Sequence, residues 1–319
     1  HNVAHSFPTR RSSDLLATRE RADGVTELRL LGQRHARLLL DGFVDGVRQS
    51  TRRIASGDQA ELQPLVYDGE REHFFYGDAQ STTLITSEGP AVVANLVGFA
   101  RGLSVERGVA RWVRLVDGRR VQLESSDPAT APFVVLAPIT GTSFDEAWTD
   151  ADEAWILMSS GSVYAVRNGV ADRVRYPADA MVPRRIFGLT GDGVRVLVGA
   201  RVVDVSTSTE VLVLQRLDVP SPPLVIEGVR GAALDVSTHL YLDGGRRMMA
   251  LAWRAQGVSV HYAAIDLDAP PTSAAELDAR PVGRTGDMFE PAITRDPSSG
   301  TFAVAWLELG SLYLQCQLP

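Results

Sequence analysis

The sequence predicts an all-β fold built from a repeated unit of three or four strands, on three observations. The stretch 291–315 contains a short strand, an Asp/Gly turn, an apolar strand that ends at Trp306, a turn with Gly310 and a third strand. The same order recurs between residues 231 and 262, where Trp253 ends the second run. Trp253 and Trp306 each stand four residues before a glycine. Repetition of a small β unit is typical of solenoids and propellers.

Earlier segments carry the same alternation of apolar strands and short turns, although the pattern is worn before residue 87. Asp-Gly between two apolar runs is a strong hairpin signal. It predicts turns at Asp41-Gly42, Asp68-Gly69 and Asp117-Gly118. The unit from 144 to 169 shows three strands, at 144–148, 153–158 and 162–166, and its closing Asn168-Gly169 turn predicts a fourth.

The spacing of the units predicts their number. The glycine before each second strand, or its equivalent, lies near residues 32, 69, 108, 152, 193, 245 and 300, so the spacings run from 37 to 55. A four-stranded propeller blade takes roughly 40–50 residues. We therefore predict a β-propeller of seven four-stranded blades over residues 16–319 as a single domain, with six blades as the alternative.

The first fifteen residues have a different character. Residues 5–15, His-Ser-Phe-Pro-Thr-Arg-Arg-Ser-Ser-Asp-Leu, match the in-frame translation of a common short-read sequencing adapter. We interpret residues 1–15 as an adapter-derived leader that is not native, and the chain as a metagenomic fragment without its authentic N-terminus. Such a leader is expected to be disordered and dispensable, because its polar residues bury too little apolar area.

Composition excludes several classes of function. The formal net charge is −7, which argues against a nucleic-acid partner, since such proteins need a basic face. All 32 basic residues are arginine, so neither a P-loop lysine nor a Schiff-base lysine is present. No apolar run reaches the roughly 18 residues of a membrane span. Nucleophile elbows, HExxH pairs and CxxC motifs are also absent from the sequence, and we expect no catalytic residue, metal or cofactor.

Two groups of possible metal ligands have simpler interpretations. The densest group of acidic residues could supply oxygen ligands for calcium. Its spacing lacks the Asp-x-Asp-x-Asp-Gly pattern of such sites, so we predict that these residues form turns and aid solubility. Its members are Asp145, Glu146, Asp150, Asp152 and Glu153. Calcium at Asp150 and Asp152 stays open. His239 and His261 lie in one unit, but two ligands make an incomplete metal site.

The final unit resembles a known repeat. Glu290-Pro-Ala-Ile-Thr-Arg-Asp296 followed by Gly300-Thr-Phe-Ala-Val-Ala-Trp306 is similar to the blade repeat of secreted or surface bacterial β-propellers. The segment from Thr294 to Phe302 also resembles the Asp-box of sialidases, with extra residues between Asp and Gly and with Phe for Trp. That box is a structural turn and not a catalytic device. The resemblance implies an extracytoplasmic protein, and we expect the protein to be monomeric.

Three functions follow as expectations, of which the third is a structural domain cut from a larger surface protein. The first is a non-enzymatic binding or scaffolding propeller whose ligand is a protein or a carbohydrate. The alternative is a carbohydrate-active hydrolase or lyase with acidic residues at the channel mouth, since propeller glycosidases draw acids from different blades. Ligands are expected where the second turns lie, because loops on a rigid scaffold tolerate function. Arg254, Gln256 and Glu308 are the candidate binding residues, with ordinary solvated turn residues as the alternative interpretation.

Overall fold

The protein is described by a computed structural model. The structure describes the following residues: 5–6, 16–20, 23, 25–34, 37–44, 47–56, 61–62, 66–67, 71–77, 81–86, 92–116, 120–127, 129, 133–134, 144–150, 153–168, 170–176, 182–188, 193–204, 209–229, 236–255, 259–282, 288–296, 298–308 and 311–319.

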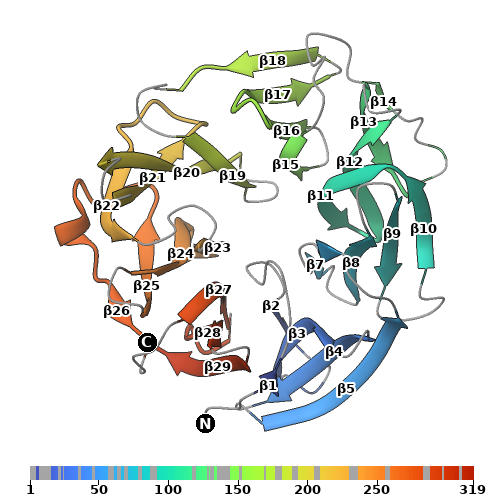
Figure 1. Cartoon of the computed structure of the whole chain (residues 1–319), viewed down its shortest axis with the longest axis horizontal. Coiled ribbons are helices and arrows are strands. Elements are labelled where there is room, and N and C mark those ends of the chain that lie inside the picture. The colour runs from blue at the N-terminus through green and yellow to red at the C-terminus, as the bar shows by residue number, and fades with distance from the viewer. Residues whose placement is uncertain are drawn as a thin grey trace. The chain divides into compact units, whose positions relative to one another are not determined.

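These residues form seven antiparallel sheets that follow one another along the chain (Figure 1). The first sheet contains β2 (Leu16–Glu20), β3 (Thr26–Arg34), β4 (Arg37–Val44) and β5 (Val47–Ser56). The second contains β6 (Glu61–Leu62), β7 (Val66–Tyr67), β8 (Glu72–Gly77), β9 (Ser81–Thr86) and β10 (Val92–Val97). The third contains β11 (Phe99–Glu106), β12 (Val109–Val116), β13 (Arg120–Ser125) and β14 (Phe133–Val134).

The remaining four sheets have four strands each. The fourth contains β15 (Phe144–Thr149), β16 (Glu153–Met158), β17 (Val163–Arg167) and β18 (Val170–Val174). The fifth contains β19 (Val182–Gly188), β20 (Arg195–Asp204), β21 (Thr209–Arg216) and β22 (Leu224–Val229). The sixth contains β23 (Val236–Asp243), β24 (Arg246–Arg254), β25 (Val260–Asp266) and β26 (Arg280–Pro281). The last contains β27 (Met288–Arg295), β28 (Phe302–Glu308), β29 (Ser311–Leu318) and β1 (His5–Ser6).

Helix is almost absent from the described part of the chain, where one short 3₁₀ turn, η1 (Ala274–Glu276), interrupts the strands. The three strands predicted between residues 144 and 166 and the fourth strand predicted after them are confirmed as β15–β18, and Gly161 in the β16–β17 turn has a φ of +81°. No helix among the described residues is long and apolar enough to cross a membrane.

The chain divides into two compact units. One contains residues 1–60, 202–212 and 224–319, and the other contains residues 61–201 and 213–223. The division passes through strands β20 and β21 of the fifth sheet. Each unit has apolar clusters of its own, and these clusters hold neighbouring sheets together.

In the first unit, Trp306 lies in the cluster between the sixth and last sheets, with no exposed surface. Its ring stacks on Tyr313 of β29 with centroids 5.7 Å apart. Trp253 is also buried, and it lies on the face of its sheet opposite Ala250 and Ala252, which contact the Trp306 cluster. Each tryptophan therefore occupies the same face of its own sheet, as the repeat predicts, and neither is displayed to solvent.

The turn predicted in the first sheet is wrong, because Asp41-Gly42 lies within β4. Gly32, which we expected to precede a second strand, lies within β3. A Cβ on Gly42 would lie 1.9 Å from Oε1 of Glu27, whose carboxylate pairs with Arg29 at 2.9 Å. Glycine at this position thus makes room for a buried ion pair rather than for a turn, and two-residue motifs do not distinguish these uses.

The leader contributes two residues to the described structure. His5 and Ser6 pair with Leu312 and Ser311 as the outer strand of the last sheet. At these two residues the expectation of disorder is wrong. That residues 1–15 are not native stays a prediction.

Candidate functional site

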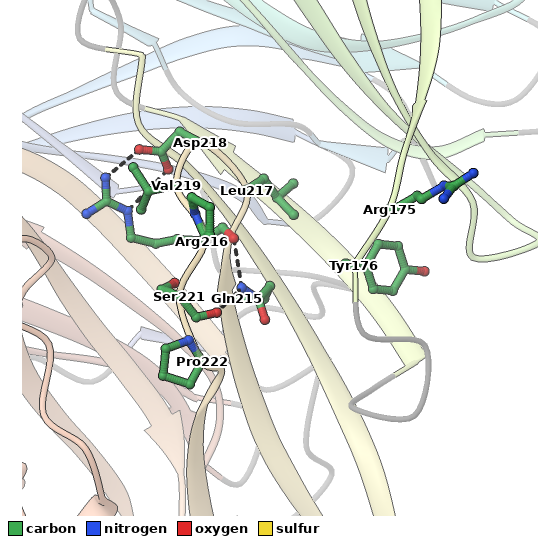
Figure 2. Close-up of a pocket in the computed structure, with 10 residues that line it drawn as sticks. Arg175, Tyr176, Gln215, Arg216, Leu217, Asp218, Val219, Ser221 and Pro222 are labelled. Atoms are coloured by element: carbon green, nitrogen blue, oxygen red, sulfur yellow. Dashed lines mark hydrogen bonds and ion pairs between the residues drawn. The ribbon is translucent and has the colours of Figure 1, made fainter.

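An open groove with a volume of about 610 Å³ lies in the second unit. Two segments line it: Arg175 and Tyr176, which directly follow β18, and residues 215–222, at the end of β21 and in the loop toward β22 (Figure 2). Strand β21 is apolar and buried from Val211 to Leu214, and the polar residues begin where the strand ends. The groove is thus formed by a loop that a buried strand holds in place.

Gln215 is the most buried polar side chain of this groove, with a relative exposure of 4%. Its Nε2 donates to the carbonyl of Arg216 at 2.8 Å and to the carbonyl of Ser221 at 2.9 Å. Figure 2 shows this carboxamide between the loop that carries Ser221 and the segment that carries Tyr176. Its Oε1 is buried and accepts no hydrogen bond from any residue that the structure describes.

Asp218 fixes the loop beyond Gln215. Its Oδ1 accepts hydrogen bonds from the backbone N of Arg195 and from Nε of Arg216, each at 3.2 Å, and its Oδ2 pairs with Nη2 of Arg216. Burial opposes the ionisation of Asp218, but these bonds outweigh it and lower the pKa of the carboxyl. The backbone N of Leu217 also donates to the carbonyl of Arg195 at 2.9 Å. The groove loop is therefore tied to the start of β20.

Arg195 lies behind this attachment and is 1% exposed. Its guanidinium pairs with Glu153 of β16 and lies 3.7 Å from Oδ2 of Asp150. Burial lowers the pKa of Arg195, while Glu153, Asp150 and Asp218 oppose that shift. Glu153 also accepts from Nε of Arg167 at 2.7 Å, and although burial opposes ionisation, its arginine partners lower its pKa. This network joins the fourth sheet to the fifth.

The indole ring of Trp148 also contacts Arg195. The guanidinium carbon of Arg195 lies 3.7 Å from the centre of the indole ring, a cation–π geometry. A Cβ on Gly188 of β19 would lie 2.4–2.7 Å from ring atoms of Trp148. Glycine at 188 therefore lets the indole lie flat against β19, where it supports Arg195.

The arrangement accounts for part of the predicted acidic group. Asp150 and Glu153 are partners of Arg195, so a cation already occupies the space beside both carboxylates. Asp152 lies outside the described residues. Among the residues that the structure describes, no three His, Cys, Asp or Glu side chains form a group that could hold a metal ion.

The two histidines considered as metal ligands have aromatic neighbours. His239 stacks on Tyr241 with centroids 5.9 Å apart, and burial lowers the pKa of His239 to about 4, with a further contribution from Arg295. His261 lies 6.0 Å from the ring of Trp253, and its Nε2 is 3.1 Å from the hydroxyl of Ser259. Burial lowers the pKa of His261 as well.

Two of the predicted binding residues, Arg254 and Glu308, lie in the first unit, away from solvent. Arg254 is the last residue of β24 and Glu308 the last of β28, and they are 7% and 8% exposed. The prediction that they are turn residues is wrong, because Arg254 still pairs with Val260 and Glu308 with Ser311. Gln256 lies outside the described residues. Their role in binding stays a prediction.

Glu308 has one unusual feature. Its Oε2 is buried and has no hydrogen-bond partner in the described part of the chain. The sequence does not indicate this burial, because a glutamate after an apolar run is typical of the start of an exposed turn. The sequence also gives little sign of Gln215, whose only signal is a polar residue that ends the buried run 211–214 before the prolines at 220, 222 and 223.

No protein-family model and no curated protein matches the sequence. Many solved structures do match. The WD40 β-propeller domain of Doa1 is 13% identical with a TM-score of 0.59, and the match covers 98% of this chain and 96% of that one. The WD40 domain of Toxoplasma gondii coronin is 11% identical with a TM-score of 0.59, over 100% and 86%. BBS1N, solved in complex with ARL6DN, is 11% identical with a TM-score of 0.57, over 100% and 95%.

These likenesses define the class of fold. The seven antiparallel sheets match the blades of WD40 propellers over nearly the whole chain, so the protein is an all-β, seven-bladed β-propeller, as predicted. At 11–13% identity the likeness shows the fold alone. Propellers host many functions, so the fold does not identify a ligand.

Proposed function

We propose that this protein is a non-enzymatic binding or scaffolding propeller that acts outside the cytoplasm. The groove at residues 175–176 and 215–222 carries the proposal. It combines an open cavity, a buried acceptor without a described partner and a loop attached to two sheets through Asp218 and Arg195. A rigid scaffold with a few fixed polar atoms is how proteins present a binding site.

The fold supports the same proposal. WD40-like propellers are typically binding or scaffold domains, and one similar structure, BBS1N, was solved with a protein partner. The extracytoplasmic location rests on the resemblance of residues 290–306 to the repeat of secreted or surface bacterial propellers. An antibody against residues 16–319 should detect the protein in periplasmic, surface or medium fractions of its source cells. Detection in the cytoplasm alone would contradict the location.

The rival function, carbohydrate cleavage, needs two carboxyl groups on either side of one space. Asp218 is the carboxylate among the described residues that line the groove, and Arg216 and the backbone of Arg195 bind it. A carboxylate held in this way is poorly placed to donate or accept a proton. The groove therefore favours binding over hydrolysis.

One experiment separates the two functions. Purified protein is assayed by biolayer interferometry against arrayed peptides and polysaccharides, and the same polysaccharides are assayed for new reducing ends and unsaturated products. We expect saturable binding without product. Product formation that scales with protein concentration would contradict the proposal and support the rival.

A further inference from the structure

The buried side-chain oxygen of Gln215, Oε1, is a hydrogen-bond acceptor without a donor among the described residues. Both hydrogens of Nε2 are used, by the carbonyls of Arg216 and Ser221. The orientation of the amide is fixed, because a flipped carboxamide would place its oxygen against those two carbonyls. Oε1 is therefore the free atom, and it is buried in the lining of the groove without a partner among the described residues. Buried polar atoms are almost always hydrogen-bonded, so a donor from outside the chain fits here.

The charge of the groove is positive. Its lining contains two arginines and one aspartate, and Asp218 is neutralised by Arg216. Arg175 is exposed and has no hydrogen bond or ion pair with any described residue. Figure 2 shows its guanidinium extending away from the Arg216–Asp218 pair. A ligand that carries a carboxylate near Arg175 would complement this charge.

The rest of the lining is largely apolar. Leu217, Val219 and Pro222 contribute to it, and Val219 is 41% exposed. A saccharide offers hydroxyl groups that need several donors and acceptors. A polypeptide in extended conformation offers a backbone N–H, which only donates, with apolar and charged side chains on either side of it.

We propose that the groove binds an extended, acidic segment of another polypeptide, whose backbone N–H donates to Oε1 of Gln215 while a carboxylate of the segment lies near Arg175. The apolar side chains of the segment then contact Leu217, Val219 and Pro222. This assignment rests on the proposed binding function and identifies its ligand class and its site.

The test begins with a displayed library of 12-residue peptides selected on the whole chain, followed by synthesis of the best binder with each backbone nitrogen methylated in turn. Methylation removes one N–H donor and leaves the side chains in place. We expect one position at which methylation weakens binding at least tenfold. The same methylation should have less than a twofold effect on binding to Gln215→Leu, because the acceptor is already gone.

Charge reversal gives a second, independent measurement. Arg175→Glu should weaken the acidic binder at least tenfold, and selection on this variant should return basic peptides. Arg48→Glu is the matched control, an exposed arginine on β5, and it should bind as the unchanged protein does. Thermal unfolding of each variant reports its fold, and the methylation series on the unchanged protein needs no variant at all.

The outcomes separate the inference from the function. Peptides that bind equally well to Gln215→Leu and Arg175→Glu would place the ligand elsewhere, which overturns the inference and leaves a binding propeller. Selection that returns no peptide also overturns it. In that case a bound polysaccharide would preserve the proposed function with another ligand, and the absence of any bound polysaccharide or protein would overturn the function too.

Discussion

Arg195 shows how much the fold depends on a single charged side chain. A guanidinium with 1% exposure needs nearly complete compensation for its lost hydration, and Glu153, Asp150 and the ring of Trp148 provide it. Replacing both partners of such a pair by apolar residues can be neutral. Removing one partner leaves a buried charge without compensation, so the two carboxylates are the sensitive positions.

Glu153→Gln should lower the free energy of unfolding by about 2–4 kcal/mol, because the guanidinium keeps a hydrogen-bond acceptor but loses the charge that neutralises it. Urea denaturation monitored by tryptophan fluorescence measures the change. Glu106→Gln is the matched control. Its carboxylate is 41% exposed and 4.0 Å from Arg107 and Arg111, so the cost should stay within about 1 kcal/mol. An equal decrease in the free energy of unfolding for both variants would show that the buried ion pair contributes no more than the exposed one.

His239 should make stability depend on pH between about 4 and 6.5. An unfolded histidine binds its proton below about pH 6.5, whereas the folded side chain, with a pKa of about 4, does so only in stronger acid. The unfolded state therefore holds more protons in this window, and stability rises with pH by up to about 3 kcal/mol.

His239→Phe should remove this part of the slope, because the phenyl ring keeps the contact with Tyr241 and does not titrate. Denaturation at pH 4.5, 5.5, 6.5 and 7.5 gives the comparison. The other charged groups around the stack, Arg295 and Asp243, remain in the variant. A slope identical to that of the unchanged protein would assign the pH dependence to other groups.

Among the elements, the turn between β27 and β28 carries its own stabilisation. Asp296 accepts hydrogen bonds from the backbone N of Ser298 at 2.9 Å and from the hydroxyl of Ser299 at 2.6 Å, and Gly300 completes the turn at a φ of +74°. Burial opposes ionisation of Asp296, but the bonds from Ser299, Ser298 and Thr26 lower its pKa to about 2. The Asp-box resemblance thus falls on a structural turn.

Trp306→Ala should cost about 3–5 kcal/mol, because an indole with no exposed surface leaves a cavity that its neighbours fill only in part. Differential scanning calorimetry or urea denaturation measures the loss. Val47→Ala, which removes two methyl groups from a residue that is 52% exposed, should be almost neutral. A loss below about 1 kcal/mol for Trp306→Ala would mean that the cavity collapses or that the ring is exposed in solution.

The elements differ in how far the sequence predicts them. The strands of the unit from 144 to 174 are predicted correctly, because short local turns separate them and their residues are either buried or alternate between buried and exposed. The turn predicted at Gly42 of the first sheet is wrong, because glycine is needed there to leave room for Glu27, a residue on another strand. Gln215 and Glu308 are not apparent for the same reason, since their burial depends on tertiary contacts that no local pattern encodes.

At the scale of the whole molecule, we expect His5 and Ser6, the described part of the leader, to contribute little to stability. Deleting residues 1–15 should change the melting temperature by less than about 2 °C, because β1 adds two residues at the outer edge of one sheet. Thermal unfolding of the full chain and of residues 16–319 under identical conditions gives the result. A drop of several degrees would show that the segment is genuine structure.

The packing of the first sheet against the last has a consequence for synthesis of the chain. Leu28 and Phe43 share one apolar cluster with Ala292, Ala303, Ala305 and Leu314, and the hydroxyl of Thr26 bonds to Asp296 at 2.9 Å. During translation, the apolar face of the first sheet is therefore made early and covered only after residue 314 has left the ribosome. Contacts of such long sequence separation form slowly, and an apolar surface that waits for its partner is a site of aggregation. We therefore expect a nascent chain of this protein to need a chaperone at its first sheet until its last sheet has emerged.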